Sequence, residues 1–233
     1  MHHLTPARSL RALARLLAYP NADLRALLPE LTPALHDEGR LTPARSAGLE
    51  RLIGSLWVSD PYDVESDYVE LFDRGRSTSL HLFEHVHGDS RDRGQAMVDL
   101  IRTYEQAGLH LPVGQGGELP DYLPLVLEFV SMLDGESAWA FTSEFAHILN
   151  ALYAALLKRR SLYAHIPAAV LELMGLAIEP TEVPEDEALD EAWAEPAAFG
   201  GCTSHGQQRP DQPQPIHIVR NKPRTASPRG ASA

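Results

Sequence analysis

Helix start signals are clearest in residues 42–72, TPARSAGLERLIGSLWVSDPYDVESDYVELF. Two pairs, Thr42-Pro43 and Asp60-Pro61, are each followed by apolar residues at helical spacing. A side chain that can cap a helix, followed by proline at the first helical position, is typical of a helix start. The stretch therefore predicts two consecutive helices.

Similar signals recur on both sides of this stretch. Thr5-Pro6 followed by Leu10, Leu13 and Leu17 predicts an amphipathic first helix. Further helices are expected over these ranges: 21–36, about 90–108, 121–133, 137–160 and 167–175. Since no run of β-branched residues alternates at period two, we predict an all-α fold.

The composition changes after the last predicted helix and divides the chain into three parts. Residues 1–177 are the predicted helical domain, and a break between two lobes is expected near the glycine-rich residues 112–117. Residues 178–199 are rich in carboxylates and predict an acidic linker. Residues 200–233 are rich in proline and polar residues, a composition that favours a disordered tail.

The chain is acidic, and the acidity lies in its main body. The formal net charge is -12, and residues 200–233 hold five Lys/Arg against one Asp, so residues 1–199 carry -16. This balance argues against a nucleic-acid partner, whose phosphates require a basic surface. It favours a basic partner, although acidity for solubility alone is equally common.

The cysteine content and the apolar runs exclude further classes. The single cysteine, Cys202, allows no intrachain disulfide and no cysteine-based metal site. No apolar run approaches the roughly 20 residues of a membrane span. The first 20 residues, MHHLTPARSLRALARLLAYP, carry arginines among their leucines and lack the apolar region of a signal peptide.

A short polar stretch, SLHLFEHVHGDSRDRGQAM at residues 79–97, suggests a functional site. His81, Glu84 and His85 match H-x-x-E-H, a zinc hydrolase pattern in which Glu84 would be the general base. A catalytic zinc needs a third protein ligand, and the sequence offers no obvious one. The alternative is a polar corner between two helices, in which arginines pair with Glu84 or neighbouring aspartates.

This stretch and a second one, GELPDYLPLVLEFVSML at residues 117–133, resemble the delta-subunit (NarJ) family of respiratory nitrate reductase. Asp67-Tyr68 and residues 71–73, Leu-Phe-Asp, add to the similarity. The resemblance covers about residues 8–177, and more weakly the stretch AWAEPAAFGG at residues 192–201.

The resemblance implies a cytoplasmic chaperone with no catalytic activity, metal or cofactor of its own, folded as a compact helical bundle of the redox-enzyme-maturation (TorD/NarJ-like) type. Such proteins bind the apo catalytic (alpha) subunit of nitrate reductase, notably its basic N-terminal segment. They keep it competent for molybdenum cofactor insertion and act on the alpha–beta complex before membrane attachment. The alternative client is a dimethyl-sulfoxide or trimethylamine-oxide reductase.

The two motifs also provide the candidate client-binding residues, and we expect the motifs to face each other at a groove between helices. The first motif contributes Glu84, His85, His87, Asp89, Arg91 and Arg93. The second contributes Glu118, Pro120, Asp121, Tyr122, Pro124 and Glu128. Helix-start geometry for the prolines and an N-cap role for Asp121 are equally good interpretations of these residues.

Overall fold

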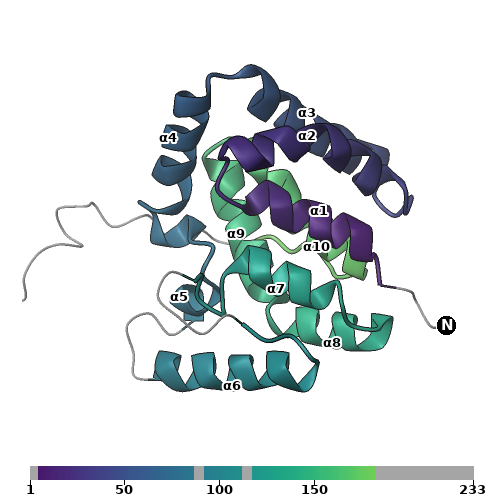
Figure 1. Cartoon of the computed structure of the whole chain (residues 1–233), viewed down its shortest axis with the longest axis vertical. Helices are drawn as coiled ribbons and strands as arrows, with labels where there is room; N and C mark the ends of the chain where they lie inside the picture. The colour runs from purple at the N-terminus through teal and green to yellow at the C-terminus, as the bar shows by residue number, and fades with distance from the viewer. Residues whose placement is uncertain (1–4, 87–91, 112–116, 182–233) are drawn as a thin grey trace, which may run out of the picture. The chain divides into compact units, whose positions relative to one another are not determined.

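The regular structure of the chain is helical, as the cap signals predict. A computed structural model describes residues 5–86, 92–111 and 117–181 (Figure 1). The helices are α1 (Ala7–Leu17), α2 (Ala22–His36), α3 (Pro43–Val58), α4 (Pro61–Phe72), η1 (Arg76–Thr78), α5 (Leu82–Val86), α6 (Asp92–Gln106), α7 (Leu123–Val130), α8 (Gly135–Glu144), α9 (Ala146–Lys158), η2 (Leu162–Ala164) and α10 (His165–Met174). In these described ranges the β-structure is an isolated bridge between His81 and Tyr122, so the all-α prediction is confirmed.

Three of the predicted capping residues begin their helices as expected, whereas the predicted Thr5 cap is wrong, because α1 begins after Pro6 and has no side-chain cap. Asp60 accepts a hydrogen bond from the Tyr62 N–H at 2.9 Å, and Asn21 accepts one from the Leu24 N–H at 3.0 Å. Thr42 caps α3 in the same way, and prolines occupy the first turns of α3 and α4. Each cap satisfies an N–H group that has no partner inside its own helix.

The single long helix predicted over residues 137–160 is wrong, because the chain breaks at Phe145 into α8 and α9. The Thr142 and Ser143 hydroxyls each donate to the carbonyl four residues earlier, at 2.7 Å, a contact that bends helices. The Phe145 side chain is buried, and its ring centroid lies 5.7 Å from that of Phe141. The packing of Phe145 therefore divides residues 137–160 into two helices, although the apolar residues on both sides of it keep helical spacing.

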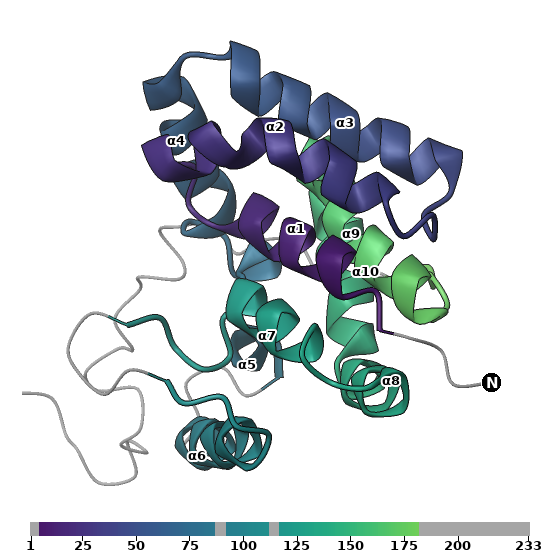
Figure 2. The ribbon, with the colours of Figure 1, turned by 45° about the vertical axis from the view of Figure 1, so that its right-hand side comes forward.

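Helix α1 lies at the centre of the hydrophobic core. Leu10, Leu13, Leu16 and Leu17 are fully buried, and α1 packs against α2, α7 and α10. Figures 1 and 2 show α2 and α3 along one side of α1, with α7 on the other side. Because burying one leucine contributes about 1.5–3 kcal/mol, this helix contributes strongly to the stability of the domain.

Helices α3 and α10 approach closely at Gly48. A Cβ atom at position 48 would overlap the imidazole ring of His165, the first residue of α10. The same ring lies near Arg45, whose Nη1 is 3.3 Å from His165 Nδ1. The absence of a side chain at Gly48 thus makes room for this contact between α3 and α10.

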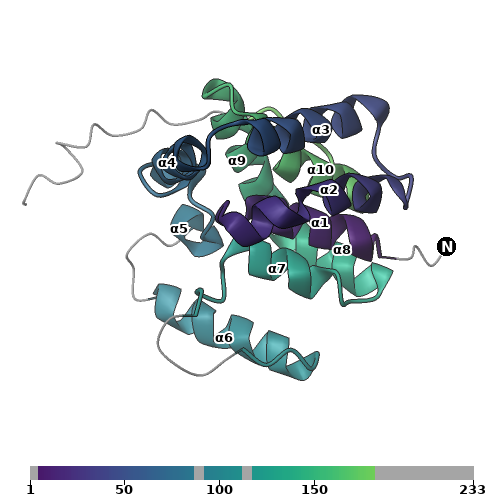
Figure 3. The same cartoon turned by 45° about the horizontal axis from the view of Figure 1, so that its top comes forward.

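Helix α6 lies at the periphery of the described helices in all three ribbon views (Figures 1 to 3). Its one fully buried residue is Tyr104, whose ring packs on Phe129 at a centroid distance of 4.6 Å. The Tyr104 hydroxyl donates to the Pro120 carbonyl at 2.8 Å. Three further apolar residues of this helix are only half-buried: Met97, Leu100 and Ile101.

The proposed division of the chain into domain, linker and tail remains a prediction. Residues 182–233, which include most of the expected acidic linker and all of the tail, lie outside the described residues, as do residues 112–116 at the expected lobe break. Among the helices of the described part, none is long and apolar enough to cross a membrane.

Candidate functional site

The two sequence motifs meet where Asp121 caps the short helix α5. The Asp121 side chain is fully buried, and its Oδ2 accepts a hydrogen bond from the Phe83 N–H at 3.0 Å. Its main-chain carbonyl accepts another from the Leu82 N–H at 3.1 Å. Asp121 is therefore an N-cap, as one interpretation expected, but it caps a helix distant in sequence rather than α7, which follows it.

The two histidines of the H-x-x-E-H pattern have different partners. His81 precedes α5, and its Nδ1 lies 3.3 Å from Asp121 Oδ1, a hydrogen bond that raises the pKa of His81. His85 is on α5; its Nε2 lies 2.9 Å from the Ser79 carbonyl oxygen, and burial lowers its pKa. Within the described ranges no three potential ligands gather around a common point. The zinc-site alternative requires His81 and His85 to bind one ion, whereas here one nitrogen of each ring is directed to a different partner.

An ion pair joins α5 to α6. Arg93 Nη2 lies 3.3 Å from Glu84 Oε1, which is one of the arginine–carboxylate pairs expected for this corner. The Arg76 guanidinium donates to the Glu84 carbonyl, so this residue is held at both its side chain and its backbone. The other candidates of this motif, His87, Asp89 and Arg91, lie outside the described residues.

A groove of about 500 Å³ runs beside the second motif. Its walls are the C-terminal half of α1, the start of α2, and residues 117–128. Four of the predicted residues line it: Glu118, Tyr122, Pro124 and Glu128. The predicted Glu84, His85, Arg93, Pro120 and Asp121 are not part of its lining. The motifs therefore meet each other at Asp121, but in the described structure only the second one borders the groove.

The groove wall is held firmly at Tyr122 and Pro124. The Tyr122 hydroxyl oxygen lies 3.4 Å from that of Tyr68, which in turn donates to the Leu17 carbonyl at 2.7 Å. Burial raises the pKa of Tyr122. Pro124 is buried in the first turn of α7, the position where proline favours a helix start. Tyr122 and Pro124 therefore form a part of the groove wall in which the side chains are held in place.

The groove combines apolar walls with excess negative charge. Its apolar lining includes Ala18, Leu24, Leu27, Leu111 and Leu125. Among the lining residues that the structure describes, the charged ones are Asp23, Glu118 and Glu128 against Arg15. Such a surface is suited to a partner that presents apolar side chains together with cationic ones.

Helices α1 and α2 contribute residues to this groove that the sequence motifs do not indicate. Arg15, Tyr19 and Leu27 lie on segments that were interpreted as ordinary helix and helix end. Leu27 is 39% exposed and Tyr19 is 43% exposed, which is high for large apolar side chains. Their exposure depends on how α1, α2 and α7 assemble, so no local pattern could have indicated it.

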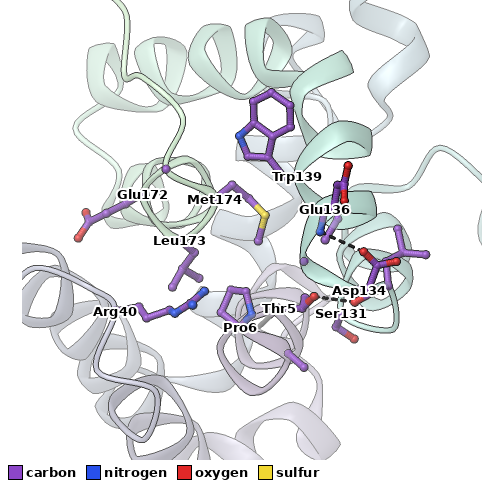
Figure 4. A pocket seen from close by; sticks show the side chains of 15 residues that line it. Thr5, Pro6, Arg40, Ser131, Asp134, Glu136, Trp139, Glu172, Leu173 and Met174 are labelled. Carbon is purple, nitrogen blue, oxygen red and sulfur yellow. Dashed lines mark hydrogen bonds between the residues drawn. The ribbon is translucent and has the colours of Figure 1, made fainter. Parts of the chain in front are cut away.

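A second cavity, of about 950 Å³, lies between the start of α1, the start of α8 and the end of α10 (Figure 4). None of the predicted residues that the structure describes lines it. Two of its carboxylates already have partners. Asp134 caps α8 through the Glu136 and Ser137 N–H groups, and Glu172 pairs with Arg45. Because four of the predicted residues line the groove beside α7 and none of the described ones lines this cavity, the groove is the stronger candidate site.

Comparison with known proteins identifies the family. The family model described as nitrate reductase delta subunit matches residues 21–166. The chain belongs to this family. The resemblance inferred from the two motifs is thereby confirmed, and both groove-lining Glu118 and the Asp121 cap lie within the matched residues.

Relatives of the delta-subunit family extend the match to most of the domain. The chain is 45% identical over 181 residues to the nitrate reductase molybdenum cofactor assembly chaperone NarJ of Escherichia coli (strain K12), covering 76% of this chain and 75% of that protein. It is 34% identical over 171 residues to a Bacillus subtilis (strain 168) protein named "Probable nitrate reductase molybdenum cofactor assembly chaperone NarJ", covering 71% and 89%. These relatives are named as assembly chaperones and not as catalysts.

The fold of the delta-subunit family member also has a counterpart among solved structures. A crystal structure of an Archaeoglobus fulgidus protein, titled as that of "A Putative Redox Enzyme Maturation Protein", superimposes with a TM-score of 0.51 and 19% sequence identity. The match covers 72% of this chain and 93% of the other. At this identity the comparison supports the fold alone, and it confirms the expected helical architecture.

Proposed function

We propose that this chain is an assembly chaperone that holds the N-terminal segment of the apo catalytic subunit of nitrate reductase in the groove beside α7. It would keep that subunit competent for molybdenum cofactor insertion, acting in the cytoplasm before the alpha–beta complex attaches to the membrane. The observation that carries the proposal is the groove itself, in which apolar side chains lie among three carboxylates and one guanidinium.

Apolar contacts would provide most of the binding free energy. Leu27 and Leu125 can receive the apolar face of an amphipathic segment, as in other grooves that bind a helix. Exposed ion pairs contribute only about 0.2–1 kcal/mol each, so Asp23 and Glu118 would mainly increase the association rate and select a basic client. Modest total affinity suits a chaperone that releases its client after assembly.

The test is calorimetric titration with a synthetic peptide of the N-terminal segment of the nitrate reductase catalytic subunit from the same genome, at low and high salt. We expect saturable one-to-one binding that weakens as salt increases, because screening acts on the charged rim. A peptide from a dimethyl-sulfoxide reductase, titrated in parallel, tests the alternative client. Tighter binding of that peptide would contradict the choice of nitrate reductase.

A matched pair of leucine variants locates the site. Leu27→Ala removes an exposed apolar contact inside the groove, whereas Leu157→Ala removes one on α9, where Leu157 is 50% exposed and outside the groove lining. We expect about ten-fold weaker peptide binding for Leu27→Ala and no change for Leu157→Ala, because only the first residue can be covered by the client. Equal affinities for both variants would place the client elsewhere.

A further inference from the structure

Arg15 carries the single positive charge among the described lining residues of the groove, and it is already paired there. Its Nη2 lies 3.1 Å from Glu128 Oε1, which connects α1 to α7 across their packing contact. The two side chains are 56% and 40% exposed, so a bound partner could reach both of them. The contact therefore lies within the surface that a client would cover.

Helix α1 has the same chemistry as the client expected for this groove. One face carries buried leucines, and the other carries Arg8, Arg11 and Arg15. Each arginine has a partner on a neighbouring segment: Arg8 pairs with Asp37, and Arg11 Nε donates to Ser131 Oγ at 3.0 Å. Arg15 thus brings to Glu128 a guanidinium like the one that a basic client would bring.

We propose that Arg15 is a built-in competitor for Glu128 and thereby sets how tightly the groove binds a cationic segment. This inference rests on the proposed function. A client lysine or arginine that reaches Glu128 must displace Arg15. The loss of the Arg15–Glu128 ion pair therefore offsets part of the favourable electrostatic free energy of binding. When the client leaves, Arg15 returns to Glu128, and neither carboxylate nor guanidinium is left unpaired during release.

The experiment compares two single variants that make the same charge change on the same helix. Arg15→Gln removes the competitor, whereas Arg8→Gln removes an arginine whose ion pair with Asp37 lies outside the groove lining. Both are titrated with the catalytic-subunit peptide and with a version of it in which every Lys and Arg is replaced by Gln. We expect Arg15→Gln to bind the basic peptide about two- to five-fold more tightly than the wild type. Affinity should not change for Arg8→Gln or for the neutral peptide.

Two further variants, Glu128→Gln and the double variant Arg15→Gln/Glu128→Gln, complete a double-mutant cycle for this ion pair. We expect Glu128→Gln to weaken binding and the gain from Arg15→Gln to disappear in its presence, because no carboxylate remains to be freed. An equal gain for Arg15→Gln and Arg8→Gln would attribute the effect to net charge and overturn the inference. Unchanged or weaker binding by a folded Arg15→Gln protein would also overturn it.

Failure of the proposed function gives a different result. If the wild-type protein does not bind the basic peptide at all, the client assignment fails, and the role of Arg15 fails with it. If the wild type binds and only the Arg15 comparison is negative, the client assignment stands. Thermal melting followed by circular dichroism shows that each variant is folded before it is titrated.

Discussion

Helices α1 and α6 both carry apolar residues at helical spacing, but their surroundings differ greatly. In α1, seven of eleven residues are buried, and the helix contacts α2, α7 and α10. In α6, one residue of fifteen, Tyr104, is fully buried. An apolar stripe in a sequence therefore predicts a helix and its inner face, but not how completely other elements cover that face.

The difference in burial between α1 and α6 matters for the proposed function, because α1 forms one wall of the groove. Arg15 and Ala18 lie where the end of this well-buried helix meets the start of α2. The client would therefore meet a rigid wall there. Helix α6 is attached mainly at Tyr104 and through the Arg93–Glu84 ion pair, so we expect it to open locally more often than α1.

The largest expected effect comes from removing a core side chain of α1. Leu13 is fully buried, so Leu13→Ala should reduce the free energy of unfolding by about 2–5 kcal/mol, through lost burial and the cavity left behind. Leu100→Ala on the half-buried face of α6 is the control and should have a much smaller effect. Urea unfolding measures both, and similar losses would show that α6 is as integral to the core as α1.

A smaller effect is expected at the anchor of α6. Tyr104→Phe keeps the ring on Phe129 but removes the hydrogen bond to the Pro120 carbonyl. We expect a loss of about 0.5–1.5 kcal/mol, because the buried carbonyl loses its partner. Hydrogen exchange should become faster in α6 while amides in α1 keep their protection. Uniformly faster exchange across both helices would contradict the separate behaviour inferred for α6.

The smallest expected effect is a pH dependence at the junction that precedes α6. The hydrogen bond to Asp121 raises the pKa of His81 above its ordinary value of 6.5. Protonated His81 therefore stabilises the folded state below about pH 6.5, and this contribution disappears as the pH rises through the raised pKa. His81→Gln should lower the melting temperature at acidic pH and change it little at alkaline pH. A difference independent of pH would show that His81 acts by packing alone.

The sequence predicts the local signals well and the tertiary ones poorly. Thr42-Pro43 and Asp60-Pro61 mark the starts of α3 and α4 because a cap acts over only a few residues. The break at Phe145 could have been suspected from Thr142 and Ser143, whose hydroxyls bend the helix, but the burial of the aromatic ring decides its place.

The candidate site likewise combines features that local sequence predicts with contacts that only the folded structure shows. Pro124 begins a helix, as its position in the sequence suggests. Asp121 caps α5 from a site about 40 residues later in the chain, and no local pattern specifies that pairing. Arg15 and Glu128 are farther apart still, and they meet only because α1 packs on α7. The motifs thus led to the right region, whereas the assembled helices determine which residues form the groove.

The contact between Gly48 and His165 also has a consequence for how the chain tolerates mutation. Helix α3 contains two glycines, and an added methyl group at Gly54 would meet open space, whereas one at Gly48 would displace the His165 ring from Arg45. In a library of random variants, changes at codon 54 should pass a folding screen freely and even be favoured, because alanine is the better helix former. Changes at codon 48 should be depleted, although both positions are glycines in the same helix.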